Sequence, residues 1–173
     1  MTIYTPQRQQ LELALDEVEL NFPAGHGGGA APAAAAVEIA GSRLDLADGR
    51  RAIFALSGVT DLSSLRRQVE ALAAVNPAAE PALVAYVPGL PKSSATLRLL
   101  TREIGILLEP GQDASAAIAG LPAGPIRAVP GAPSGYVIDT ADPFTALEVA
   151  EALRQRPGVS AAYPIVRRLV FGR

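Results

Sequence analysis

Residue types that could do chemistry are sparse in this sequence, and the glycine-rich run at residues 25–29 is the first place to look. It contains the chain's one histidine, His26. A glycine-rich loop cradles phosphates when a Lys-Ser or Lys-Thr pair follows it, because the lysine and the hydroxyl complete the anion site. Here Ala30, Ala31 and Pro32 follow instead. We therefore interpret the run as a flexible loop and His26 as a solvated side chain.

Other catalytic or metal-binding groups are equally limited. The chain has no cysteine, which excludes a disulfide framework, a thiol nucleophile and a thiolate metal site. A nucleophilic serine would need a base, and His26 is the only imidazole available. Asp16 and Glu17 fit a strand junction, Asp61 fits a helix cap, and the other carboxylates are dispersed. We predict no catalytic residue, no metal site, no cofactor and no enzymatic activity.

Composition bounds the size of the core and the kinds of partner. Of 173 residues, 49% are hydrophobic and 18% are charged, and the formal net charge is -2. The length allows one larger domain or two small ones, and the charge argues against a nucleic-acid partner. No stretch approaches the roughly 18 apolar residues of a membrane span, and residues 1–8 lack the features of a signal peptide. We expect no membrane partner and a cytoplasmic chain, unless the sequence is a fragment of a secreted precursor.

An internal repeat with a period of about 80–86 residues is the strongest sign of domain organisation. The matching segments keep their order over most of each half. Residues 11–13, 17–20, 69–72 and 85–86 match residues 97–99, 103–106, 150–153 and 162–163, respectively. Chance similarity between alanine-rich helices is the alternative explanation. The repeat predicts two domains, at residues 1–90 and 91–173.

The hydrophobic pattern predicts similar elements in both halves. In the first half we expect a short helix at residues 30–36 and strands at residues 11–15, 18–22, 37–46, 51–56 and 82–87. Asp48 and Gly49 are a strong turn signal between the third and fourth of these strands. A helix is expected after Asp61, ending near Val75. Its apolar residues are spaced 3, 4 and 3 apart on one face: Leu62, Leu65, Val69 and Leu72.

The second half repeats this order with different turns. A short helix is expected at residues 113–119, and the strands at residues 97–100, 104–108, 126–129, 136–139 and 159–166. Asp142 and Pro143 start a longer helix, because aspartate caps well and proline tolerates the first helical position. Each half thus reads β-α-β-β-α-β, preceded by an extra strand. The predicted fold is α+β, with two tandem ferredoxin-like modules. Each module would have an antiparallel sheet with its helices on one face and the other face free for a partner.

Part of the second half resembles the prodomain of subtilisin-like serine proteases. Residues 146–153 have the pattern A-L-x-x-A-x-x-L, and residues 157–164 have the pattern P-G-V-x-x-A-x-P. Together with residues 135–140, these segments look like the end of such a prodomain, and residues 103–111 resemble its opening strand. The resemblance covers about residues 92–173 directly and residues 1–90 only through the internal repeat.

The resemblance implies an inhibitor or folding chaperone of a subtilisin-like serine protease. The prodomain sheet docks on two surface helices of the protease, and the residues after its last strand lie in the active-site cleft. An extended segment can bind there by β-augmentation. The resemblance puts Arg173 in the first substrate pocket and Val170 in the fourth. The implied cleft-binding tail consists of Leu169, Val170, Phe171, Gly172 and Arg173.

Several features leave alternatives open. Prodomains of this family place an acidic residue where the sheet meets the N-termini of the protease helices. The loop at residues 130–134 has none, whereas Asp45 and Asp48 lie in the corresponding loop of the first half and make it a candidate docking loop. A doubled module suggests a stand-alone inhibitor, and the tail could instead complete the sheet of its own domain. The alternative function is a non-catalytic scaffolding or regulatory domain that assembles through exposed sheet faces, including as a homo-oligomer.

Overall fold

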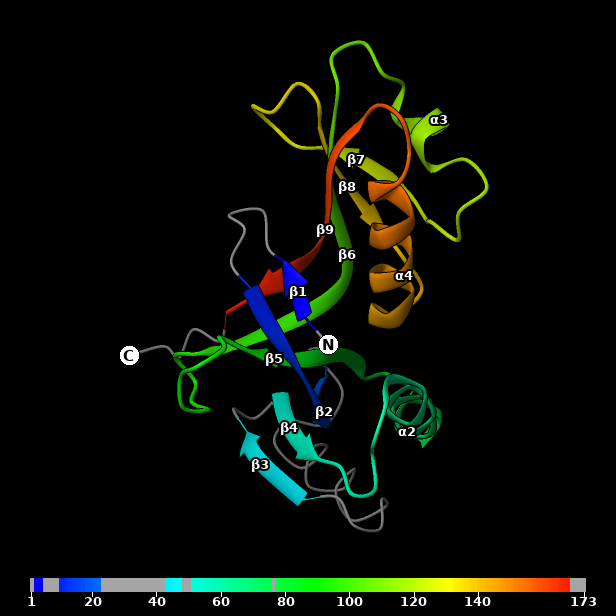
Figure 1. Cartoon of the computed structure of the whole chain (residues 1–173). Coiled ribbons are helices and arrows are strands. Elements are labelled where there is room, and N and C mark those ends of the chain that lie inside the picture. The colour runs from blue at the N-terminus through cyan, green and yellow to red at the C-terminus, as the bar shows by residue number, and fades with distance from the viewer. Residues whose placement is uncertain (1, 5–9, 23–42, 48–50, 76, 169–173) are drawn as a thin grey trace.

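The computed structural model describes residues 2–4, 10–22, 43–47, 51–75 and 77–168. Its strands are β1 Thr2–Tyr4, β2 Gln10–Asn21, β3 Arg43–Ala47, β4 Arg51–Ala55, β5 Glu80–Tyr86, β6 Leu97–Leu108, β7 Ile126–Ala128, β8 Gly135–Asp139 and β9 Val159–Arg167. Its helices are α2 Leu62–Val75, α3 Ala114–Ile118 and α4 Pro143–Arg154. These strands form one antiparallel sheet, so the fold is α+β (Figure 1).

The main path of the sheet runs β3-β4-β2-β5-β6-β8-β7, while β1 pairs with β2 and β9 pairs with β6. The first half therefore has the order β5-β2-β4-β3, and the second half has the order β9-β6-β8-β7. The two halves are joined directly, because β5 pairs with β6 from Leu83 opposite Leu100 to Tyr86 opposite Leu97. The sheet thus continues across the boundary expected after residue 90.

The long strands β2 and β6 each take the place of two expected strands, so the predicted strand ends at residues 15 and 100 are wrong. In β2, the register with β5 shifts between Leu13 and Val18. The residues packed toward the helices are odd-numbered before this shift and even-numbered after it. Extra residues in a bulge move the alternation by one position without ending the strand. In β6, the register with β9 shifts between Leu100 and Ile104.

Most other elements follow the prediction. The hairpin is confirmed, because β3 and β4 pair from Arg43 opposite Ala55 to Ala47 opposite Ala52. The strands expected at residues 82–87, 126–129, 136–139 and 159–166 correspond to β5, β7, β8 and β9. The helix expected at residues 30–36, the turn at residues 48–50 and His26 lie outside the described residues.

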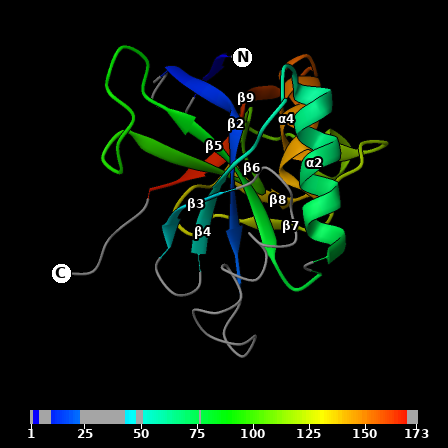
Figure 2. The ribbon, with the colours of Figure 1, turned by 90° about the horizontal axis from the view of Figure 1, so that it is seen from below.

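Helices α2 and α4 lie on the same face of the sheet (Figure 2). As predicted, α2 begins after Asp61 and buries Leu65, Val69 and Leu72. The backbone N–H of Ser64 donates to the Asp61 carboxylate at 2.7 Å. Hydrogen bonds from Ser64 hold the pKa of Asp61 below its ordinary value. None of the described helices is long and apolar enough to cross a membrane.

One apolar cluster draws on both halves of the chain. Phe144 and Leu147 of α4 and Leu100 of β6 pack with first-half residues such as Phe54 and Leu65. A second cluster lies within the second half and includes Ile104, Ile106, Ile138 and Leu153. The two long helices are also linked by charge, because Arg66 of α2 lies 2.9 Å from Glu148 and 5.1 Å from the centre of the Phe144 ring. Packing therefore couples the two halves.

Removing the cap of α4 should cost measurable stability. The Asp142 carboxylate accepts hydrogen bonds from the backbone N–H groups of Phe144 and Thr145, both at 2.8 Å. We expect Asp142→Ala to lower the free energy of unfolding by about 1–2 kcal/mol, because two N–H groups at the helix start lose their acceptor. Urea unfolding followed by circular dichroism measures this. Asp113→Ala at the five-residue helix α3 is the matched control and should cost less; equal losses would contradict the argument.

Candidate functional site

The residues predicted to bind a partner are mostly outside the part of the chain that the structure describes. This holds for the tail, Leu169 to Arg173, and for Asp48. Asp45 lies in β3, which is at one end of the main path of the sheet. The structure does describe Arg167 and Arg168, where the chain leaves β9. It therefore shows the base of the tail and the face of the sheet beside it.

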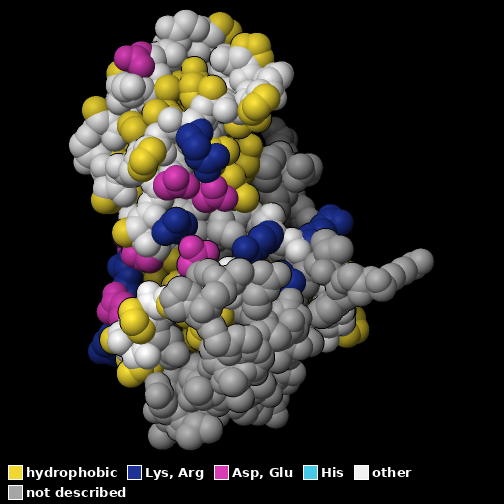
Figure 3. Space-filling model, turned by 180° about the vertical axis from the view of Figure 1, so that it is seen from behind, with side chains coloured by type: hydrophobic (Ala, Val, Ile, Leu, Met, Phe, Trp, Pro, Cys, Tyr) yellow, Lys and Arg dark blue, Asp and Glu magenta, His cyan; other side chains and the backbone are white. Residues whose placement is uncertain are grey.

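In the second half, the sheet face opposite the helices holds small and apolar side chains. We call this set the open face: Gly105 and Leu107 of β6, Val137 of β8, and Ala161, Tyr163 and Ile165 of β9. It lines a hollow of about 270 Å³. Leu107 is 44% exposed and the neighbouring Val129 is 36% exposed. In Figure 3, hydrophobic side chains gather over the second half of the chain, at the top of the view. Accessible apolar side chains grouped in this way are typical of protein-binding surfaces.

At the centre of the open face, the ring of Tyr163 lies over Gly105. The two residues are paired across β6 and β9, and a Cβ added to Gly105 would overlap the Tyr163 ring. The glycine therefore makes room for the aromatic side chain. Sequence reasoning missed this pair. The available signal was a glycine inside a strand, which often marks the close approach of another group.

A charged group borders the open face. Glu103 and Asp139 stand directly opposite each other on β6 and β8, an arrangement that destabilises a sheet when the charges are alike. Arg127 of β7 offsets this repulsion, because its Nη2 lies 2.6 Å from Glu103 Oε1 and 3.5 Å from Asp139 Oδ1. The border therefore combines one cation with two anions.

On the same face, the side chains around β4, β5 and the start of β6 are buried. An apolar cluster without any helix residue lies there, with Ile53, Val84, Leu97 and Leu99 all buried. Val18 of β2 faces the helices, so the next residue, Glu19, lies on the opposite face of the sheet, where it is also buried. The two halves thus share a strand order but present different surfaces. On this side of the sheet, the apolar side chains of the second half are accessible, whereas the cluster around Ile53 and Val84 is buried.

The buried carboxylate of Glu17 in β2 binds Tyr86, the last residue of β5, and Lys92 in the connection from β5 to β6. Glu17 accepts a hydrogen bond from the Tyr86 hydroxyl at 2.5 Å and one from Lys92 Nζ at 2.7 Å. Burial lowers the pKa of Lys92, but the hydrogen bond and charge of Glu17, together with Asp16, outweigh it and raise the pKa above the ordinary lysine value. Lys92 is therefore a structural cation at neutral pH.

Near the base of the tail, two more arginines are held in place. Arg98 Nη1 donates to the carbonyl oxygens of Ala95 and Leu97 at 2.9 and 2.7 Å. Burial, and then the charge of Arg168, lower the pKa of Arg98. Arg167 Nη2 lies 2.9 Å from Glu19 Oε2. The end of β9 is thus held by an ion pair, and its next residue lies within electrostatic reach of a second arginine.

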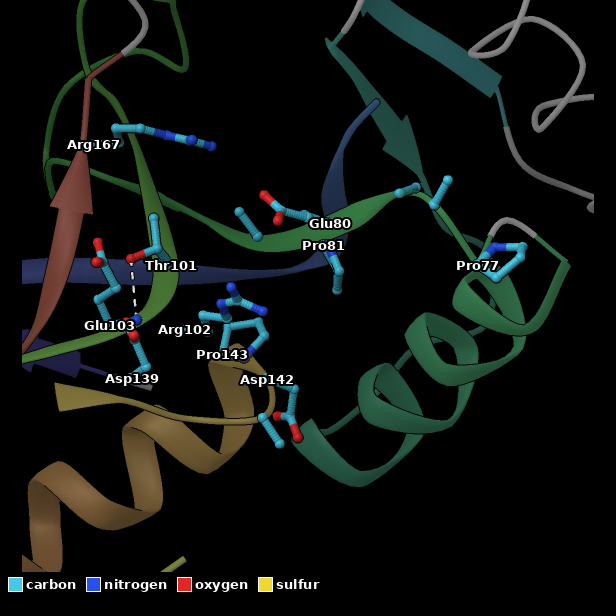
Figure 4. A pocket seen from close by; sticks show the side chains of 14 residues that line it. Pro77, Glu80, Pro81, Thr101, Arg102, Glu103, Asp139, Asp142, Pro143 and Arg167 are labelled. Atoms are coloured by element: carbon cyan, nitrogen blue, oxygen red, sulfur yellow. Dashed lines mark hydrogen bonds between the residues drawn. The ribbon is translucent and has the colours of Figure 1, made fainter. Parts of the chain in front are cut away.

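A pocket of about 510 Å³ lies where β6 passes from β5 to β8 (Figure 4). Its charged lining has both signs and comes from β5, β6, β8, β9 and the start of α4: Glu80, Arg102, Glu103, Asp139, Asp142 and Arg167. None of the described lining residues is a serine, cysteine or histidine, so these residues include no pair of nucleophile and imidazole base. Among the described residues, no three His, Cys, Asp or Glu side chains are grouped to hold a metal ion.

The chemistry that these surfaces support is binding, through an accessible apolar face with a charged border. In comparisons with known proteins, no family model matches the chain, and no curated protein or solved structure shows a significant match.

Proposed function

We propose that this chain is a non-catalytic, protein-binding inhibitor or folding chaperone of a subtilisin-like serine protease. We also propose that its α+β fold consists of two tandem ferredoxin-like modules. The strand orders β5-β2-β4-β3 and β9-β6-β8-β7 support this assignment, because both place the fourth strand of a β-α-β-β-α-β unit beside the first, followed by the third and the second. In the first module, the helix expected between β2 and β3 lies outside the described residues.

The observation that carries the proposal is the continuity between the open face and the base of the tail. Strand β9 contributes Ala161, Tyr163 and Ile165 to the open face and ends two residues before Leu169. A partner that covers this face is therefore also within reach of the residues that follow β9. Subtilisin-like proteases fit both requirements, since they offer surface helices for a sheet and a cleft that takes an extended peptide. The proposed tail, Leu169 to Arg173, would lie in that cleft.

The proposed docking border differs from the one expected from sequence. Asp45 lies on β3, and β3 is separated from β6 by β4, β2 and β5. A partner on the open face would meet Glu103 and Asp139 instead. These carboxylates suit the N-terminus of a partner helix, where the helix dipole favours negative charge. The proposal therefore assigns the docking border to Glu103 and Asp139 rather than to Asp45 and Asp48.

The direct test is inhibition of a purified subtilisin, measured with a chromogenic peptide substrate. We expect residues 1–173 to inhibit competitively, and removal of residues 169–173 to raise the inhibition constant at least about tenfold, because an extended segment in the cleft supplies main-chain hydrogen bonds and side-chain contacts. A control variant replaces the five tail residues with glycine and serine, which keeps the length but removes the side chains. Absence of inhibition by the intact chain would overturn the protease proposal. Equal inhibition by intact and shortened chains would overturn the role of the tail.

The exposed side chains Leu107 and Val129 also favour a second candidate, assembly with another copy through the open face. A dimer of this kind would bury the face on both protomers with two-fold symmetry. Sedimentation equilibrium of the free chain tests it. A monomer at micromolar concentration argues against assembly. A dimer dissociated by Leu107→Arg, which places a charge on the face, would favour assembly over protease binding.

A further inference from the structure

The ion pair between Glu19 and Arg167 joins two strands at opposite ends of the sequence. The residues are 148 positions apart, and Arg167 Nη2 lies 2.9 Å from Glu19 Oε2. The Glu19 side chain is 1% exposed, whereas the Arg167 side chain is 42% exposed. A buried carboxylate is stable as an ion only with a cation beside it. Arg167 places such a cation beside Glu19, and the pair therefore stabilises the buried charge.

Arg167 is also the last residue of β9, and its backbone pairs with Leu99. The final residues of a strand fray readily, because few contacts hold them. Here the side chain ties this end to β2 of the first half. The next residue, Arg168, is close enough to Arg98 for its charge to act on that guanidinium.

The first half holds its own last strand in a similar way. Tyr86, the last residue of β5, pairs with Glu12 of β2, and its hydroxyl donates to Glu17. The last strand of each half, β5 or β9, therefore ends in a residue whose side chain binds a carboxylate of β2. Glu17 holds β5, and Glu19 holds β9. In this way a strand of the first half positions the end of the second half.

We infer that the first half positions the end of β9, from which the proposed tail starts, and that Glu19, through Arg167, is a positioning residue for this end of the strand. This inference rests on the proposed function for its consequence in binding. It accounts for the different surfaces of the two halves. The second half presents the accessible face, and the first half holds the end of the strand beside it, through Glu19 and Arg167. A binding segment whose starting point is held loses less conformational entropy on binding and binds more tightly.

The first experiment measures the free chain and needs no partner. Hydrogen exchange of backbone amides is compared for the wild type, Glu19→Gln and the matched control Glu17→Gln. Both substitutions remove a buried charge from the same face of β2 while keeping the shape of the side chain. We expect Glu19→Gln to speed exchange at residues 165–168 about tenfold or more relative to residues 159–163. Glu17→Gln should leave this ratio unchanged. An unchanged ratio in Glu19→Gln would overturn the inference.

The second experiment is a cycle between this substitution and the tail, read as inhibition of purified subtilisin. In the chain with residues 169–173, Glu19→Gln should raise the inhibition constant about fivefold, because the end of β9 from which the segment starts is no longer held. In the chain that ends at Arg168, the same substitution should change it less than about twofold. An equal effect in both chains would show a merely structural role and overturn the inference. Absence of inhibition by the wild type would instead overturn the proposed function, while the exchange experiment still decides the positioning role.

A second variant keeps the test decisive if Glu19→Gln does not fold. The double variant Glu19→Gln with Arg167→Gln removes both charges of this ion pair and lets two amides face each other. It should show the same loss of protection at the end of β9. The single variant Arg167→Lys keeps the cation but not the planar fork of the guanidinium. We expect it to retain most of the wild-type protection. No difference between these two variants would contradict a role for the ion pair.

Discussion

Replacing Phe144 by alanine is expected to lower the free energy of unfolding by about 3–5 kcal/mol, with the loss felt in both halves of the chain. Phe144 is 3% exposed and lies in α4 of the second half, yet it packs in the cluster that contains Phe54 and Leu65 of the first half. The substitution leaves a cavity in this shared core and removes the ring beside the Arg66 guanidinium. Denaturant unfolding gives the loss, and native-state hydrogen exchange shows where it is felt.

The matched control is Leu153→Ala, in the same helix. Leu153 is fully buried, but its cluster consists of second-half residues. If the continuous sheet and shared core make one cooperative unit, both variants should lower the protection of amides in β2 and β4. If the halves are independent domains, Leu153→Ala should leave β2 and β4 unchanged. That outcome would contradict cooperative unfolding and would favour the division at residue 90 expected from the repeat.

Gly105→Ala is expected to separate binding from stability. The new Cβ would overlap the far end of the Tyr163 ring, so the ring must leave its position at the centre of the open face. We expect partner binding to weaken about 30–100-fold, because a central aromatic side chain is typical of binding hot spots. The free energy of unfolding should change by less than about 1 kcal/mol, since the ring can turn toward solvent and alanine reduces the freedom of the unfolded chain.

Two further variants test this reasoning with the same inhibition and unfolding measurements. Tyr163→Phe keeps the ring and should bind nearly as well as the wild type. Tyr163→Ala should weaken binding as much as Gly105→Ala, and the two substitutions together should add little, because both act through the position of one ring. Additive losses would show that Gly105 acts through something other than Tyr163. Unchanged binding in all variants would place the partner elsewhere on the molecule.

The helices were predictable because their signals are local. A capping aspartate and apolar residues on one helical face suffice to place α2 after Asp61 and α4 after Asp142, and the structure agrees. The long strands were not predictable in the same way. Whether the polar interruption after residue 15 ends a strand or forms a bulge depends on the pairing with β5. That partner is distant in the sequence, so the local pattern leaves the choice open.

The candidate site shows the same difference between what local sequence signals predict and what long-range contacts decide. By itself, the sequence determined that the chain is poor in catalytic groups, that its fold is α+β, and where most elements lie, since these depend on composition and short-range periodicity. Only the tertiary structure decided which sheet face is accessible, that Gly105 seats Tyr163, and that Glu19 meets Arg167 across 148 residues. The physical reason is that strand pairing and burial of charge are long-range properties. They exist only once the β2 and β6 strands have been brought into one sheet.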